Sequence, residues 1–183
     1  MAQIRSLKPN VTMDEAVKQF SGGGLLSRIH HTAFGPLCSV AEFYIPFRLF
    51  EVEVVNRGKS NLYTLGLDAV TGSLSPYAFE LLPSNNDVSS VETRNCISSC
   101  LSETEASDMI IAKVRRILFS SGFFRIQNLR ISAYPVPDEI HIPYWVGFRG
   151  KGSKAHIAMI DAVRRHMEGG KTRSLLQNWL LNS

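Results

Sequence analysis

The sequence lacks the features that would place it outside the ordinary globular proteins. Its 183 residues include three cysteines, too few for a disulfide framework, so a reduced compartment is expected. No apolar run approaches the roughly 20 residues that cross a bilayer, and no apolar stretch follows Arg5 and Lys8 as a secretory signal requires. Charged residues make up 20% and apolar residues 44%, which excludes disordered and fibrous chains. A cytoplasmic protein with a packed core is therefore expected.

The common catalytic motifs are also missing from the sequence. It contains no Gly-x-Ser-x-Gly elbow, and the glycines at 22–24 have neither the preceding strand nor the following Lys-Ser/Thr of a phosphate-binding loop. We therefore expect no catalytic residues, no cofactor and a protein that is not an enzyme.

The spacing of two of the cysteines makes a zinc site an alternative to free reduced thiols. Cys96 and Cys100 are four residues apart, within the range that zinc sites use. No second close pair follows, so Cys38 or His31 would have to complete the ligand set through folding. Reduced thiols without a metal are the favoured interpretation.

Positive charge is concentrated in the second half of the chain. Residues 1–91 contain 7 Lys and Arg against 8 Asp and Glu, whereas residues 92–183 contain 13 against 8. An excess of this kind favours an acidic partner, such as a protein surface, a nucleic acid or an anionic lipid. The alternative is a solvated surface that keeps the protein soluble.

Four short landmarks occur twice in the same order, which predicts an internal duplication. They are Phe-Ser at 20 and 119, Ile-Pro at 45 and 142, Arg-Gly-Lys at 57 and 149, and Asp-Ala-Val at 68 and 161. The predicted organisation is a first unit at 11–82, a polar linker at 83–101 and a second unit at 102–183.

Each unit is expected to be an α+β structure, with its helix packed on its own antiparallel sheet. Capping-box pairs, Thr12 with Glu15 and Ser102 with Glu105, predict helices at 13–20 and about 103–119. Apolar Phe50, Val52 and Val54 alternate with two glutamates, which predicts a half-buried strand. The remaining predicted elements are a turn at 56–59, hairpins continuing through 63–68 and 144–160, strands at 26–33 and 124–133, and a C-terminal amphipathic helix at 172–181.

The segment Asp68-Ala69-Val70-Thr71-Gly72 resembles the end of the hairpin in a PepSY-type unit, a small cystatin-like fold in which a helix lies on an antiparallel sheet. A degenerate second copy at 161–165 carries Arg164-Arg165 in place of Thr-Gly. The resemblance implies a non-catalytic binding or regulatory module.

Asp68 and Asp161 are expected to have a structural role, each in the turn that follows its strand. An aspartate at a strand end can accept hydrogen bonds from the following backbone N–H groups, and Gly72 suits a left-handed position in such a turn. A pair of carboxylates for acid–base chemistry is the alternative.

Two groups of residues are candidates for binding a partner. Proline favours strand starts and edges, so the aromatic residues near Pro46 and Pro143 are candidates for a contact surface on an edge strand. Packing on the helix of their unit is the favoured interpretation, because aromatic residues are core residues first. The basic residues lie on or beside the second predicted hairpin. The candidates are Tyr44, Phe47, Tyr144, Trp145, Arg149, Lys151, Lys154, Arg164 and Arg165.

These observations favour a non-enzymatic interaction module, for example an accessory subunit of a larger assembly, whose protein partner has an acidic surface. A nucleic-acid-binding protein that uses Tyr144 and Trp145 beside the basic residues is a second hypothesis. A protein that binds a small ligand between helix and sheet is a third.

Overall fold

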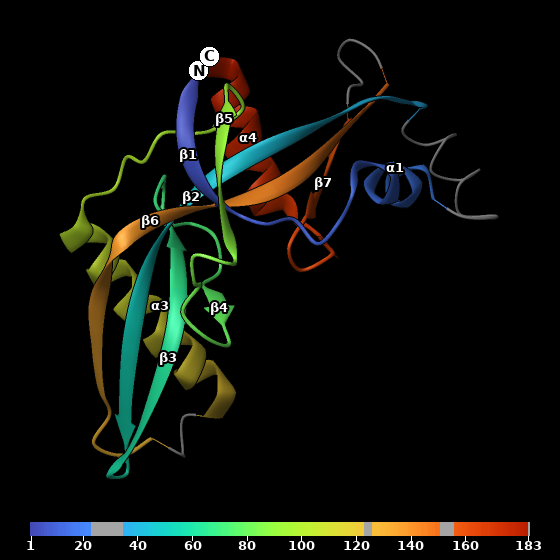
Figure 1. Ribbon diagram of the computed structural model, residues 1–183. Coiled ribbons are helices and arrows are strands. Elements are labelled where there is room, and N and C mark those ends of the chain that lie inside the picture. The colour runs from blue at the N-terminus through green and yellow to red at the C-terminus, as the bar shows by residue number, and fades with distance from the viewer. Residues whose placement is uncertain (23–34, 123–125, 151–155, 183) are drawn as a thin grey trace.

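A computed structural model describes residues 1–22, 35–122, 126–150 and 156–182. It is an α+β protein with a curled sheet (Figure 1), which confirms the predicted class. None of the described helices is long and apolar enough to cross a membrane. The elements are β1 (Ala2–Leu7), α1 (Met13–Ser21), β2 (Leu37–Asn56), β3 (Lys59–Asp68), β4 (Tyr77–Phe79), β5 (Val88–Thr93), α3 (Glu103–Gly122), β6 (Arg130–Arg149), β7 (His156–Asp161), β8 (His166–Met167) and α4 (Gly170–Asn182).

The long strands β2 and β6 pair with each other in antiparallel orientation and form the centre of the sheet. Ile45 lies opposite Ile142 near the middle of this pair, and both side chains are fully buried. The strand β3 pairs with the second half of β2, and β7 pairs with the second half of β6. Because β2 and β6 run in opposite directions, the two hairpins, β2–β3 and β6–β7, extend toward opposite ends of the molecule (Figure 1).

The local sequence explains the first hairpin. Phe50, Val52 and Val54 are buried and Glu51 is exposed, as the alternation predicts. Arg57 and Gly58 form the turn, and both have positive φ angles, 54° and 74°. A two-residue loop of this kind matches the right-handed twist of paired strands.

Both predicted capping boxes are present at the helix starts. The Thr12 hydroxyl accepts the N–H of Glu15, and the Glu15 carboxylate accepts the N–H of Thr12. Ser102 and Glu105 form the same two hydrogen bonds at the start of α3.

The sequence predicts that each helix packs on the hairpin that follows it in the chain, and the structure differs from this prediction. Ala106, Ile110 and Val114 of α3 pack against the first hairpin in a cluster with Phe50 and Leu65. Ile131 and Ala133 from the first part of β6 pack against the same cluster, so α3 covers strands from both halves of the chain. An apolar helix face does not determine by itself which strands it covers.

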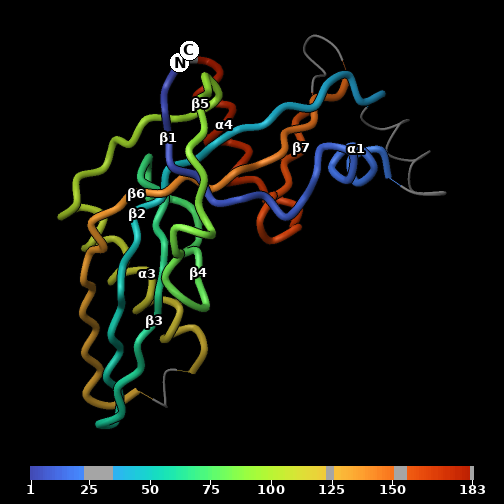
Figure 2. The backbone as a smooth tube through the Cα atoms, in the orientation of Figure 1, coloured from blue at the N-terminus to red at the C-terminus, as the bar shows by residue number. Residues whose placement is uncertain are grey.

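The helix α1 lies at the other end of the molecule, against the second hairpin (Figure 2). Its residues Ala16 and Phe20 form a cluster with Trp145 and Ile160. A Cβ atom at Gly147 would lie 2.9 Å from the Phe20 ring, so the absence of a side chain at 147 makes room for the helix.

Hydrogen bonds around Ala69 attach the start of α3 to the first hairpin. The N–H of Ala69 donates to the carbonyl of Pro46 at 2.8 Å, and the carbonyl of Ala69 accepts the N–H groups of Cys100 and Leu101. The Arg48 guanidinium donates to the carbonyl of Leu101 at 3.1 Å. These bonds fix the chain just before α3 begins.

The same pattern recurs around Ala162, where the chain leading into α1 meets the second hairpin. The N–H of Ala162 donates to the carbonyl of Pro143 at 3.0 Å, and its carbonyl accepts the N–H groups of Asn10 and Val11. The Trp145 indole donates to the carbonyl of Val11 at 2.8 Å. Each half of the chain thus holds the helix start of the other half by equivalent contacts.

The remaining elements join the two ends. The range predicted as a polar linker, 83–101, contains β5, which pairs with β1 from Ala2–Thr93 to Leu7–Val88. The helix α4 begins two residues before the predicted start, and its Leu175 and Leu176 are buried in the largest apolar cluster. The predicted strand at 26–33 lies outside the described residues, and β6 begins only at Arg130, within the predicted 124–133.

Candidate functional site

Asp68 ends β3 and is fully buried. Its Oδ1 accepts the N–H groups of Thr71 and Gly72, both at 2.9 Å, and its Oδ2 accepts the N–H of Leu74 at 2.8 Å. Gly72 has a φ of 64°, which favours glycine. The carboxylate therefore holds together the turn that leads into the chain after the first hairpin.

Asp161 occupies the corresponding place at the end of β7. Its Oδ1 accepts the N–H groups of Val163 and Arg164, at 2.8 and 2.9 Å. Arg165 has a left-handed φ of 59° and corresponds in this respect to Gly72 in the first turn. Asp68 and Asp161 lie at the ends of different hairpins, and each accepts backbone N–H groups of its own turn. The Asp161 Oδ1 also accepts the Tyr77 hydroxyl at 3.5 Å, and its buried Oδ2 has no hydrogen-bond partner among the described residues.

The aromatic candidates are buried in the core and not on a surface. Phe47, Tyr144, Tyr44 and Trp145 have exposed fractions of only 1–7%. A partner on the surface therefore has little access to these side chains, and none of them is placed to stack on the bases of a nucleic acid.

The prolines beside these aromatic residues lie in the two central strands and not at the sheet edge. Pro46 faces His141, and Pro143 faces Tyr44. The carbonyls of Pro46 and Pro143 point to the side of β3 and β7, where Ala69 and Ala162 donate to them. A residue's N–H and C=O point to the same side of a strand. The N–H that each proline lacks would therefore point toward the turn that follows β3 or β7, and its absence costs no hydrogen bond between paired strands.

Basic side chains gather on the segment from the end of β7 to the first turn of α4, and we call them the cationic face. Arg164 is exposed, with its guanidinium 3.2 Å from the centre of the Tyr77 ring and a hydrogen bond to the Ala78 carbonyl at 2.7 Å. Arg165 pairs with Glu15 of α1 at 3.7 Å. The cationic face consists of Arg164, Arg165, His166, Lys171 and Arg173.

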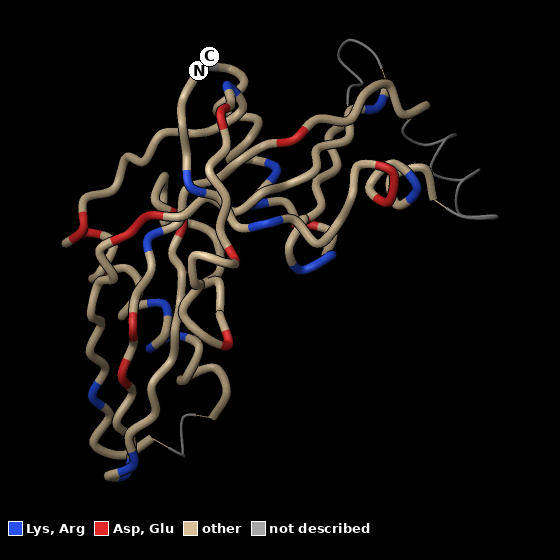
Figure 3. Tube along the Cα trace, viewed as in Figure 1, with Lys and Arg blue, Asp and Glu red and all other residues tan. Residues whose placement is uncertain are grey.

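Within residues 164–173 the sequence has one acidic residue, Glu168, and its Oε2 accepts the Thr172 hydroxyl at 2.7 Å. Figure 3 shows Lys and Arg positions (blue) on the turn between β7 and β8. The predicted candidates Lys151 and Lys154 lie outside the described residues.

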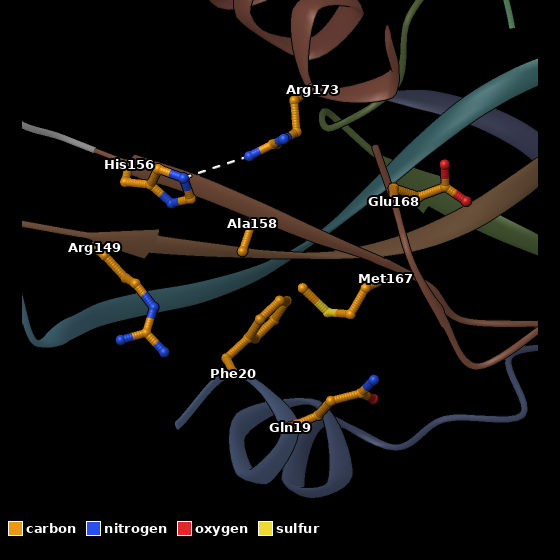
Figure 4. A pocket seen from close by; sticks show the side chains of 8 residues that line it. All are labelled: Gln19, Phe20, Arg149, His156, Ala158, Met167, Glu168 and Arg173. Atoms are coloured by element: carbon orange, nitrogen blue, oxygen red, sulfur yellow. Dashed lines mark hydrogen bonds between the residues drawn. The ribbon is translucent and has the colours of Figure 1, made fainter. Parts of the chain in front are cut away.

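A cavity of about 400 Å³ opens beside the cationic face, and we call it the cationic pocket. Figure 4 shows the side chains around it, which come from α1, β6, β7, β8 and the start of α4. Two of them are arginines, Arg149 and Arg173, and the others are Gln19, Phe20, His156, Ala158, Met167 and Glu168.

The first hairpin has a hollow in the corresponding place. It measures about 260 Å³ and lies between β3 and the second half of α3. Tyr63 pairs with Val52 there, as His156 pairs with Arg149 in the second hairpin. The lining of this hollow is apolar apart from the Tyr63 hydroxyl, so the positive charge distinguishes the pocket of the second hairpin.

The thiols do not form a metal site in the described part of the chain. Cys38 and Cys100 are exposed, and burial raises the pKa of the half-buried Cys96 thiol. Among the described residues, no three His, Cys, Asp or Glu side chains lie close enough together to hold a metal ion. The pair His30-His31 lies outside these residues.

Sequence reasoning identified Arg149, Arg164 and Arg165, but it missed Phe20, His156, Met167 and Arg173. These residues lie far apart in the chain, and Phe20 reaches the pocket only because α1 crosses to the second hairpin. The positive bias of the second half was the one available signal.

No protein-family model matches the chain, no curated protein is significantly similar to it, and no solved structure matches its fold.

Proposed function

We propose that this protein is a non-enzymatic interaction module that binds an acidic surface of a partner protein through its cationic face. The observation that carries the proposal is the gathering of four Arg and Lys side chains on 164–173, with the one acidic side chain there, Glu168, hydrogen-bonded to Thr172. Complementary charge of this kind speeds association and selects partners.

The repeated architecture supports a binding role. We propose that the equivalent contacts of Ala69 and Ala162 derive from an internal duplication of PepSY-type units, as the repeated Asp-Ala-Val landmarks suggest. The resemblance to these units implies a non-catalytic module. The same proposal places the protein in the cytoplasm, as an accessory subunit of a larger assembly.

A charge-reversal experiment tests the proposed face. The protein is used as bait in an extract of its native host, and the captured proteins are identified by mass spectrometry. We expect the double variant Arg164→Glu, Lys171→Glu to capture the partner at least about tenfold less than the unmodified protein, because like charges then face each other.

The matched control reverses two exposed charges elsewhere, with Arg115→Glu and Arg116→Glu on α3. This control is expected to retain the partner. Equal capture by both double variants would contradict the proposal. Loss of the captured material on nuclease treatment would favour the nucleic-acid hypothesis instead.

A further inference from the structure

Among the residues that the structure describes, Arg149 is a buried cation without a carboxylate partner. Its side chain lies at the end of β6 and is 5% exposed. Its Nη1 donates to the carbonyl of Gly35 at 3.2 Å. All sixteen Asp and Glu residues belong to the part of the chain that the structure describes, and none pairs with Arg149 within 4.0 Å. Burying an unpaired charge is costly, and arginine stays protonated in proteins.

A second guanidinium, that of Arg173 on α4, also lines the cavity. Its Nη1 lies 3.4 Å from the His156 Nε2, on the other side of β7 from the Arg149 guanidinium (Figure 4). Because a guanidinium only donates, the His156 Nε2 accepts in this contact. Among the described residues Arg173 also forms no ion pair.

The other side chains on the Arg149 side of β7 form an apolar wall. Phe20 of α1, Ala158 of β7 and Met167 of β8 lie together there (Figure 4). The Glu168 carboxylate points away from Arg149 in the same view and accepts the Thr172 hydroxyl. The volume of about 400 Å³ lies within the range of about 300–1,000 Å³ that small-molecule sites occupy.

From these observations we infer that the cationic pocket binds a small organic acid, in which an apolar chain carries a carboxylate or phosphate group. The anionic group lies at the Arg149 guanidinium, where charge-assisted hydrogen bonds are strong. The apolar chain lies against Phe20 and Met167. This site goes beyond the proposed function, because a small acid needs no partner protein in order to bind.

The test uses methyl NMR of the full chain, with ¹³C-methyl methionine as the label. The probes are hexanoate and hexyl phosphate, with 1-hexanol as the neutral control. Met167 lines the pocket, whereas Met1 and Met109 lie elsewhere and serve as internal references. We expect both acids to shift the Met167 signal saturably, hexanol to shift it much less, and the reference signals to stay unchanged.

Variants connect the shift to the Arg149 guanidinium. Arg149→Met is expected to weaken hexanoate binding by about 10- to 100-fold, as expected from removing charged hydrogen bonds. Arg130→Met, at the exposed start of the same strand, is the matched control and should bind normally. If Arg149→Met does not fold, Arg149→Gln provides the same comparison.

Two results would overturn the inference. One is equal binding of hexanol and hexanoate, or unchanged hexanoate affinity in the guanidinium variants. The other is tighter binding of an acetylated Gly-Glu-Gly peptide than of hexanoate, which would assign the pocket to an acidic side chain of a protein. Neither result bears on capture through Arg164 and Lys171, so the two proposals fail separately.

Discussion

Replacement of Ile110 by alanine is expected to lower the free energy of unfolding by about 2–5 kcal/mol. Ile110 is fully buried where α3 covers the first hairpin, in the cluster that contains Phe50 and Leu65. Alanine leaves a cavity there, because β2 and β3 cannot close over the missing atoms. Chemical denaturation followed by circular dichroism measures the change.

The control for this variant lies on the same helix. Ile117 is 51% exposed, so Ile117→Ala is expected to change stability by no more than about 0.5 kcal/mol. Equal losses for the two variants would contradict the described packing of α3.

The second large effect is expected at the end of the first hairpin. Asp68→Ala removes the acceptor of three backbone N–H groups, those of Thr71, Gly72 and Leu74. A hydrogen bond to a charged group contributes about 1.5–3 kcal/mol, and the donors of Gly72 and Leu74 are left in a buried position. We expect a loss of at least about 3 kcal/mol in the free energy of unfolding, measured by the same denaturation experiment.

Asp138 provides the matched substitution on the surface. Its carboxylate is 61% exposed and pairs with Arg5 at 2.8 Å. Exposed pairs contribute about 0–1 kcal/mol, so Asp138→Ala should be nearly neutral. If Asp68→Ala were as mild as Asp138→Ala, the turn would not depend on the aspartate.

Local elements could be predicted from the sequence because their signals are local. The alternation at Phe50, Val52 and Val54 gave the strand, and the pairs Thr12–Glu15 and Ser102–Glu105 gave the helix starts. Each signal depends on residues within a few positions of one another, and the structure contains each of these elements.

The crossing of the helices could not be predicted in the same way. The apolar positions of α1 and α3 show that each helix covers a sheet, but they do not say which one. The choice depends on long-range contacts, such as Trp145 with Val11 and Arg48 with Leu101. The same limit left two interpretations open for Tyr44, Phe47, Tyr144 and Trp145, a contact surface and packing in the core, since their burial follows from the pairing of β2 with β6.

The candidate site was predictable only through its charge. Arg149 belongs to a landmark repeated in the sequence, but its neighbours in the cationic pocket come from α1, β7 and α4. The excess of positive charge in residues 92–183 indicated an acidic target without indicating the shape of the site.

Photo-crosslinking from within the cationic face tests the proposed function most directly. His166 is exposed between Arg164 and Lys171, and the substitution His166→p-benzoylphenylalanine places a photoreactive group there. The same group introduced at Lys59, at the tip of the first hairpin, is the control. We expect the partner to be crosslinked from position 166 and not from position 59. Crosslinking of the partner from 59 alone, or equally from both positions, would contradict binding through the cationic face.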